Sequence, residues 1–202
     1  MPRPCICNGA IGVDIARAAD NNGATFMLFN IIDMSVGYQI VSLFRAGRGA
    51  PTRTECLDVL TQRWASWAGY PKQLIADRGL NNRGAFAREL AAAGVYASST
   101  GLEAPYQLGK AERRGGMWKT VAPRVIEQKV FTGHNRMERF VMEVNSAMNE
   151  MNRSGGFSPS QWVIGRQPRS SAAERGDDDQ ALQLGSVEER IDPAAFFLIA
   201  RL

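Results

Sequence analysis

The sequence has few cysteines, a single histidine and no long apolar run. Three cysteines in 202 residues exclude a disulfide-dense small protein and are typical of a reducing compartment. The longest apolar runs, Ala24–Phe29 and Ala194–Ala200, fall far short of the roughly 20 residues that span a bilayer. The first residues hold no apolar segment like that of a signal peptide. We therefore expect an intracellular protein that is not secreted and has no membrane partner.

The residues that are present have the composition of a folded domain. Hydrophobic residues make up 45% of the chain and charged residues 22%, which excludes a wholly disordered or collagen-like chain. The net charge of +4 is unevenly spread: residues 1–173 carry 21 basic and 13 acidic side chains, whereas residues 174–202 carry 3 and 7. A basic body with an acidic tail is typical of a protein whose body binds a polyanion.

The spacing of apolar residues predicts an α/β fold with a five-stranded mixed sheet flanked by helices. The first three strands form an antiparallel meander, with a turn at Asn21-Asn22-Gly23. The expected strands are 11–16, 25–32, 38–44, 73–76 and 95–97, and the expected helices are 54–68, 84–93, one from about 111, and 136–152. We expect residues 1–10 to be an irregular lead-in, residues 11–153 a core domain, and residues 154–202 a post-core segment with an acidic, partly disordered tail.

Three acids stand out by their position in this order of elements. Asp14 lies within the first strand, Asp77 directly follows the fourth, and Glu112 lies at the start of the helix after a polar loop. Ligands of α/β sheets bind where strands end, and an acid inside an apolar strand needs its charge compensated. Mg²⁺ prefers such carboxylate oxygens. These positions therefore suggest a metal site, although three of 20 acids can also fall near strand ends by chance.

Several segments resemble the catalytic core of retroviral and retrotransposon integrases, which are DDE polynucleotidyl transferases. The resemblance runs from about Gly12 to Arg169, and its fragments occur in the family's order and spacing. The matching segments are Gly12–Ile15, Asn30–Ser35, Gly69–Gly79, Gln107–Arg113 and Gly156–Pro168. The resemblance implies a ribonuclease H-like fold, a homo-oligomer, DNA ends and target DNA as partners, and a nuclear place of action.

The family's metal-binding triad matches Asp14, Asp77 and Glu112. Asp77 and Glu112 have 34 residues between them, one fewer than is common in the family, and the loop before Glu112 can absorb the difference. The resemblance implies that these three residues are catalytic and hold two Mg²⁺ or Mn²⁺ ions. It also implies two reactions, DNA 3′-end processing and strand transfer.

Basic residues surround Glu112 in the sequence. Lys110, Arg113, Arg114 and Lys119 are candidate DNA-binding residues, because phosphate contacts carry much of the affinity for DNA. The alternative is a solvated helix face without a partner. The chain also departs from the family, with Leu108 where Asn is frequent and Gly116 where a basic residue is common.

Two other functions remain open. The first is an inactive, domesticated or decaying integrase fragment that binds nucleic acid or self-associates. The Gly115-Gly116 pair, the acidic tail and the missing counterpart of the family's upstream His/Cys zinc domain favour it. The second is a ribonuclease H-type nuclease with the same metal chemistry, against which the segment Gly109–Arg113 argues.

Four further features have structural interpretations. We expect Asp33 to be a turn residue, and His134 to have an exposed capping or loop role. Trp64 and Trp67 are expected in the core, at helical spacing. Cys5 and Cys7 are too few to form a metal site by themselves.

Overall fold

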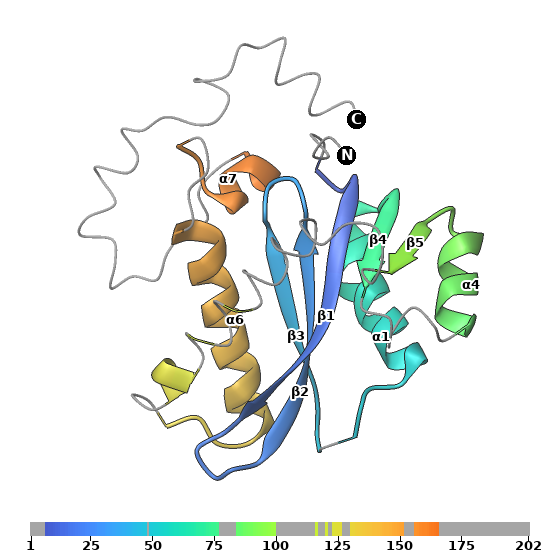
Figure 1. Ribbon diagram of the computed structural model, residues 1–202. Coiled ribbons are helices and arrows are strands. Elements are labelled where there is room, and N and C mark those ends of the chain that lie inside the picture. Colours follow the sequence, from blue (N-terminus) through green and yellow to red (C-terminus); the bar gives the residue numbers. More distant parts are fainter. Residues whose placement is uncertain are drawn as a thin grey trace.

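The computed structural model describes residues 7–47, 49–76, 84–99, 116, 120, 123–126, 130–151 and 156–165. Three strands come first along this part of the chain, and helices then precede and follow the last two strands (Figure 1). The strands are β1 (Ala10–Ala19), β2 (Thr25–Asp33), β3 (Gln39–Ala46), β4 (Gln73–Ala76) and β5 (Tyr96–Ser99). The helices are α1 (Arg53–Leu60), the π-helix η1 (Thr61–Ala65), α2 (Ser66–Ala68), α4 (Gly84–Ala92), α6 (His134–Met151) and α7 (Pro159–Ile164).

The five strands form one mixed sheet with the order β3-β2-β1-β4-β5. The β1–β2 and β2–β3 pairs are antiparallel, as the predicted meander requires. The β1–β4 and β4–β5 pairs are parallel. This arrangement confirms the mixed, five-stranded α/β sheet expected from the sequence and puts β1 at its centre.

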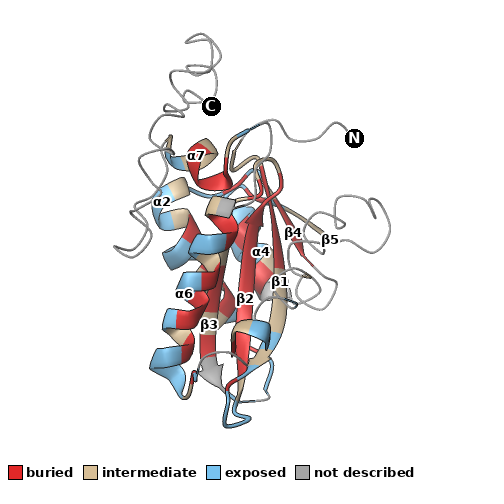
Figure 2. Cartoon of the chain, turned by 90° about the vertical axis from the view of Figure 1, so that its left-hand side faces the viewer, coloured by how far each residue is buried: buried red, intermediate tan, exposed pale blue. Residues whose placement is uncertain are grey.

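Helices cover both faces of the sheet. On one face α1, η1 and α4 pack on Phe29, Ile31 and Leu74 through buried residues such as Trp64 and Phe86. On the other face α6 packs on β2 and β3 with the apolar side that its periodicity predicts: Met137, Phe140, Val141, Val144 and Met148 are all buried. Figure 2 shows these buried residues along β2 and the inner side of α6. The core therefore has two parts, one on each side of the sheet.

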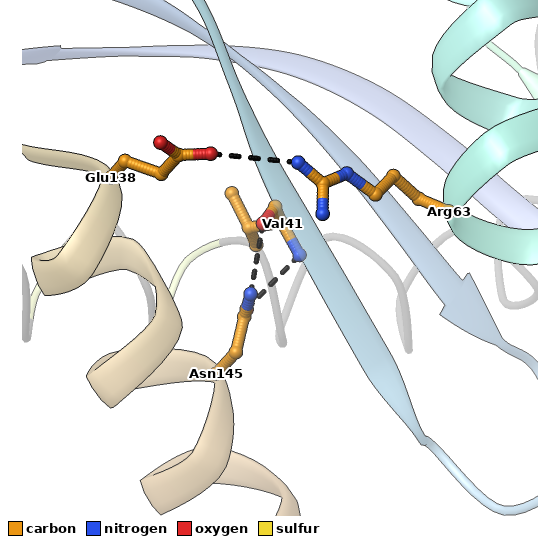
Figure 3. Close-up of polar contacts among 4 residues, drawn as sticks. All are labelled: Val41, Arg63, Glu138 and Asn145. Carbon is orange, nitrogen blue, oxygen red and sulfur yellow. Dashed lines mark hydrogen bonds and ion pairs between the residues drawn. The ribbon is translucent and has the colours of Figure 1, made fainter. Parts of the chain in front are cut away.

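The outer edge of β3 is covered by two asparagines of α6. Asn145 accepts a hydrogen bond from the Val41 N–H at 3.0 Å and donates to the Val41 carbonyl at 2.8 Å (Figure 3). Asn149 makes the same pair of bonds with Gln39, at 2.8 and 2.7 Å. Unpaired edge strands are prone to pair with other chains, so these side chains satisfy the edge and fix α6 against the sheet. An ion pair 3.5 Å long between Arg63 and Glu138 joins η1 to α6.

The helix expected over residues 54–68 differs in its details. Its N-cap is Thr52, which forms a capping box with Glu55, and the π-helix η1 interrupts it. Trp64 is fully buried, as expected, and its indole N–H donates to Asn8 Oδ1 at 2.8 Å. The prediction that Trp67 is a core residue is wrong, because 48% of it is exposed. The π-turn shifts the helical register, and Trp67 consequently lies at the rim of the core with its ring against Trp64.

The five strands, α4 and α6 agree with the sequence within a few residues. Most of the helix expected from about residue 111 lies outside the described residues. Gly69 and Gly94 follow the ends of α2 and α4 with positive φ angles of 75° and 76°, as expected for glycines that end helices. Helix α7 was not predicted, although Ser158 and Gln161 form a capping box and Pro159 lies at its start. None of the helices described is both long and apolar enough to cross a membrane.

Candidate active site at the junction of β1 and β4

Asp14 lies near the middle of β1 and is half-buried. Its cross-strand partner on β2 is Asn30. On the other side β1 pairs with β4, and the last residues of this parallel ladder are Val13 and Ala76. Asp14 is therefore the first residue of β1 beyond the ladder with β4.

The alternation of side chains assigns Asp14 to one face of the sheet. Val13 and Ala76 belong to the core under α1 and α4. Ala10 packs with Ile75 in a separate cluster on the opposite face. Since Asp14 is four residues after Ala10, it shares the face of Ala10 and Ile75.

The other predicted ligands and DNA contacts lie outside the described residues. Asp77 follows Ala76 directly in the sequence, and Glu112 belongs to the segment between β5 and Gly116. The DNA-binding candidates Lys110, Arg113, Arg114 and Lys119 also lie outside the described part of the chain. Their roles remain predictions.

A buried row of amide side chains lies on the same face and was not predicted. Asn30 and Gln39 are buried, and Gln39 Nε2 donates to Asn30 Oδ1 at 2.8 Å. Asn149 of α6 then holds both backbone groups of Gln39. The available signal in the sequence was a pair of polar residues inside otherwise apolar strands.

Asp33 is the turn residue expected from the sequence. Its carboxylate is fully buried at the end of β2 and accepts hydrogen bonds from the backbone N–H groups of Asn8, Ser35 and Val36 at 2.6, 2.8 and 2.9 Å. The Ser35 hydroxyl donates to the same carboxylate. These bonds close the turn between β2 and β3 and tie it to the start of β1.

Cys7 lies beside Asp33. Burial, followed by the negative charge of Asp33 and a hydrogen bond to it, raises the pKa of the Cys7 thiol to about 12. Because the thiolate is the form that binds metals, the raised pKa disfavours the ligating form of Cys7 at neutral pH. Cys5, its expected companion, lies outside the described residues.

His134 is the first residue of α6 and is exposed. Its ring lies 6.2 Å from that of Phe26, centroid to centroid. The preceding Gly133 donates its N–H to Asp20 at 2.9 Å, which fastens the β1–β2 turn to the start of α6. The expected exposed position of His134 at a helix start is confirmed.

The fold is similar to solved structures of retroviral integrases. The HTLV-2 integrase catalytic core domain in complex with magnesium matches in its dimeric form with a TM-score of 0.61, at 16% identity, over 77% of this chain and 96% of that one. The trimeric form matches with a TM-score of 0.62, at 16% identity, over 79% and 98%. No family model and no curated protein matches the sequence.

A chain of the simian T-cell lymphotropic virus intasome, solved in complex with PP2A regulatory subunit B56 gamma, matches with a TM-score of 0.66 at 15% identity. The match covers 85% of this chain and 61% of that one. The chain has the ribonuclease H-like fold of retroviral integrase catalytic cores. The fold expected from the sequence is thereby confirmed.

In this integrase-like fold, the donor chemistry around Asp14 suits a hard divalent cation. Carboxylate oxygens are the ligands that Mg²⁺ prefers, and two or three carboxylates with several waters suffice. No three His, Cys, Asp or Glu side chains within the described ranges lie close enough together to hold a metal ion. A complete metal site at this position would therefore need further ligands from outside the described residues.

Proposed function

We propose that the chain is the catalytic core of a retroelement integrase, which processes DNA 3′ ends and transfers them into target DNA. The observation that supports this most strongly is the pairing of Val13 with Ala76. Each of these residues directly precedes one of the two predicted aspartates, Asp14 and Asp77. Continued alternation beyond Ala76 would give Asp77 the same face as Ile75, which is the face of Asp14.

The chemistry requires these carboxylates to act together. Asp14, Asp77 and Glu112 would supply the oxygen ligands for two Mg²⁺ or Mn²⁺ ions. Two such ions, when bound, activate an attacking water or DNA 3′-hydroxyl and stabilise charge on the leaving oxygen. Asp14 would be a half-buried ligand on the central strand β1. No serine or tyrosine nucleophile is assigned, because the in-line attack needs no covalent enzyme intermediate.

The proposal extends to partners. Lys110, Arg113, Arg114 and Lys119 would contact DNA phosphates beside the carboxylates. We propose self-association as well, since the related structures include dimeric and trimeric forms of a catalytic core. Integration into chromosomal DNA would take place in the nucleus.

A strand-transfer assay with labelled DNA ends and Mn²⁺ tests the proposed function. Asp14→Asn, Asp77→Asn and Glu112→Gln should each abolish product, because each keeps the side-chain shape but loses the anion that binds metal. Asp58→Asn removes an exposed acid from α1 and should retain the parent's activity. An active Asp14→Asn variant, with DNA binding unchanged, would refute the assignment.

The second candidate is an inactive module that binds nucleic acid or self-associates. It is favoured by Gly116, which has a helical backbone and lies four residues after Glu112 in the sequence. Glycine in a helix interior costs about 1 kcal/mol relative to alanine, so the helix predicted to begin near Ala111 would be weakened. This candidate predicts a parent protein that binds DNA, gives no strand-transfer product and is not stabilised by Mg²⁺.

A further inference from the structure

Two buried amide side chains, Asn30 and Gln39, lie on the Asp14 face of the sheet among mostly apolar residues. Asn30 lies on β2 with Leu28 and Ile32 as its neighbours on the same face, and the residue is 4% exposed. Gln39 is completely buried. Burying amides costs free energy unless they are hydrogen-bonded, and an apolar residue at either position would avoid this cost. Packing alone therefore does not account for the two amides.

The hydrogen bonds determine how the Asn30 amide is oriented. Gln39 Nε2 donates to Asn30 Oδ1 from the β3 side. Because Oδ1 and Nδ2 diverge from one carbon, the two N–H groups of Asn30 are directed away from Gln39. On that side the cross-strand neighbour of Asn30 is Asp14, and directly opposed residues of an antiparallel pair have Cβ atoms about 4.5–5.5 Å apart.

Gln39 is itself held in place. Its backbone N–H and carbonyl are both bonded to Asn149 of α6. Its Oε1 is the one buried side-chain nitrogen or oxygen in the described part of the chain that has no hydrogen-bond partner. Gln39 thus leaves an acceptor unsatisfied, which costs free energy, while its Nε2 orients Asn30.

We propose that Asn30 is a positioning residue for the metal site: its side-chain N–H groups, directed by Gln39 toward β1, orient the Asp14 carboxylate when it binds a metal ion, although no hydrogen bond joins Asn30 and Asp14 in this structure. This inference rests on the proposed function, because it assumes that Asp14 binds a metal ion. Partners behind the ligands commonly orient metal-binding carboxylates, and their removal costs about 10–100-fold in metal affinity.

The test is the Mn²⁺ dissociation constant, measured on the full chain by electron paramagnetic resonance. Asn30→Leu removes the amide and should weaken Mn²⁺ binding about 10–100-fold. Gln39→Met leaves Asn30 in place, removes its orienting donor together with the unpaired Oε1, and should weaken binding several-fold while the fold is kept. Asn145→Leu is the matched control: it also removes a hydrogen-bonded amide, at the β3 edge, and should leave the dissociation constant unchanged.

Asp14→Asn distinguishes failure of the positioning role of Asn30 from failure of the metal site itself. If Asp14→Asn abolishes Mn²⁺ binding but Asn30→Leu and Gln39→Met keep the parent's affinity, the positioning role is overturned and the metal site stands. Equal losses in Asn30→Leu and Asn145→Leu would also overturn it, since general destabilisation would then explain both. If Asp14→Asn leaves Mn²⁺ binding unchanged, the proposed function and this inference fail together.

Discussion

Val13 and Ala76 are paired in the parallel ladder between β1 and β4, and each is followed in the sequence by an aspartate. The pairing defines the register of β1 against the end of β4. It also makes Asp14 the residue that continues β1 beyond this ladder. The integrase interpretation depends on this register, because a shift of one residue would move Asp14 to the other face of the sheet.

The salt dependence of DNA binding tests the predicted basic surface. Replacing Lys110, Arg114 and Lys119 together by alanine should weaken binding nearly equally for unrelated duplexes. The log–log slope of affinity against salt should flatten by about 0.9 for each phosphate that the variant no longer neutralises. The control replaces three exposed arginines of α1, α4 and α6, Arg53, Arg88 and Arg139. A slope that changes in the control but not in the test variant would place the DNA elsewhere.

Gly116→Ala should stabilise the protein. Gly116 has helical backbone, and a Cβ placed there meets no heavy atom within 4 Å among the described residues. Alanine should therefore raise the free energy of unfolding by about 0.5–1 kcal/mol, measured by urea denaturation. Gly94→Ala is the control with the opposite sign. Its φ of +76° is in the left-handed region, which costs a residue with a Cβ about 1–2 kcal/mol.

If Gly116→Ala also raises strand-transfer activity, the glycine limits how firmly Glu112 is held. Unchanged stability would mean that the backbone at Gly116 is not helical in solution.

Most of the sheet was predictable from local signals. Alternating and continuously apolar segments gave the five strands, and the turn at Asn21-Asn22-Gly23 gave the first hairpin, in which Gly23 has a φ of 78°. The buried side of α6 could also be predicted from the sequence, because a helix that packs on a sheet has apolar residues at every third or fourth position.

The features that were missed depend on tertiary contacts. The π-helix η1 has no simple sequence pattern, and its extra residue in the turn is what exposes Trp67. Asn145 and Asn149 read as ordinary polar residues until β3 is known to be an edge strand. The amide pair of Asn30 and Gln39 requires the strand register, which periodicity alone does not give.

Asp20 predicts a pH dependence of stability. The backbone N–H of Gly133, with further bonds from Ala24 and Asn22, holds the pKa of the Asp20 carboxyl below its usual value. A carboxyl with a lowered folded-state pKa stabilises the fold fully above its unfolded pKa of about 3.9. That contribution is lost as the pH falls through the folded-state pKa.

Asp20→Asn should accordingly be less stable than the parent at pH 7, as measured by urea denaturation. The difference between the two proteins should begin to shrink below about pH 4, where the unfolded chain takes up a proton at Asp20, and should be lost once the pH has fallen through the lowered folded-state pKa. A difference that stays constant down to about pH 2 would show that the charge of Asp20 does not contribute.

Anomalous diffraction from a crystal soaked in Mn²⁺ is the most direct test of the central claim. The account predicts an anomalous peak between the carboxylates of Asp14 and Asp77, with metal–oxygen distances of roughly 2.0–2.2 Å, close to those of Mg²⁺. The peak should disappear in Asp14→Asn and persist in Asp58→Asn. A well-ordered site in which the two carboxylates point to opposite faces of the sheet, or a peak that does not involve Asp14, would contradict it.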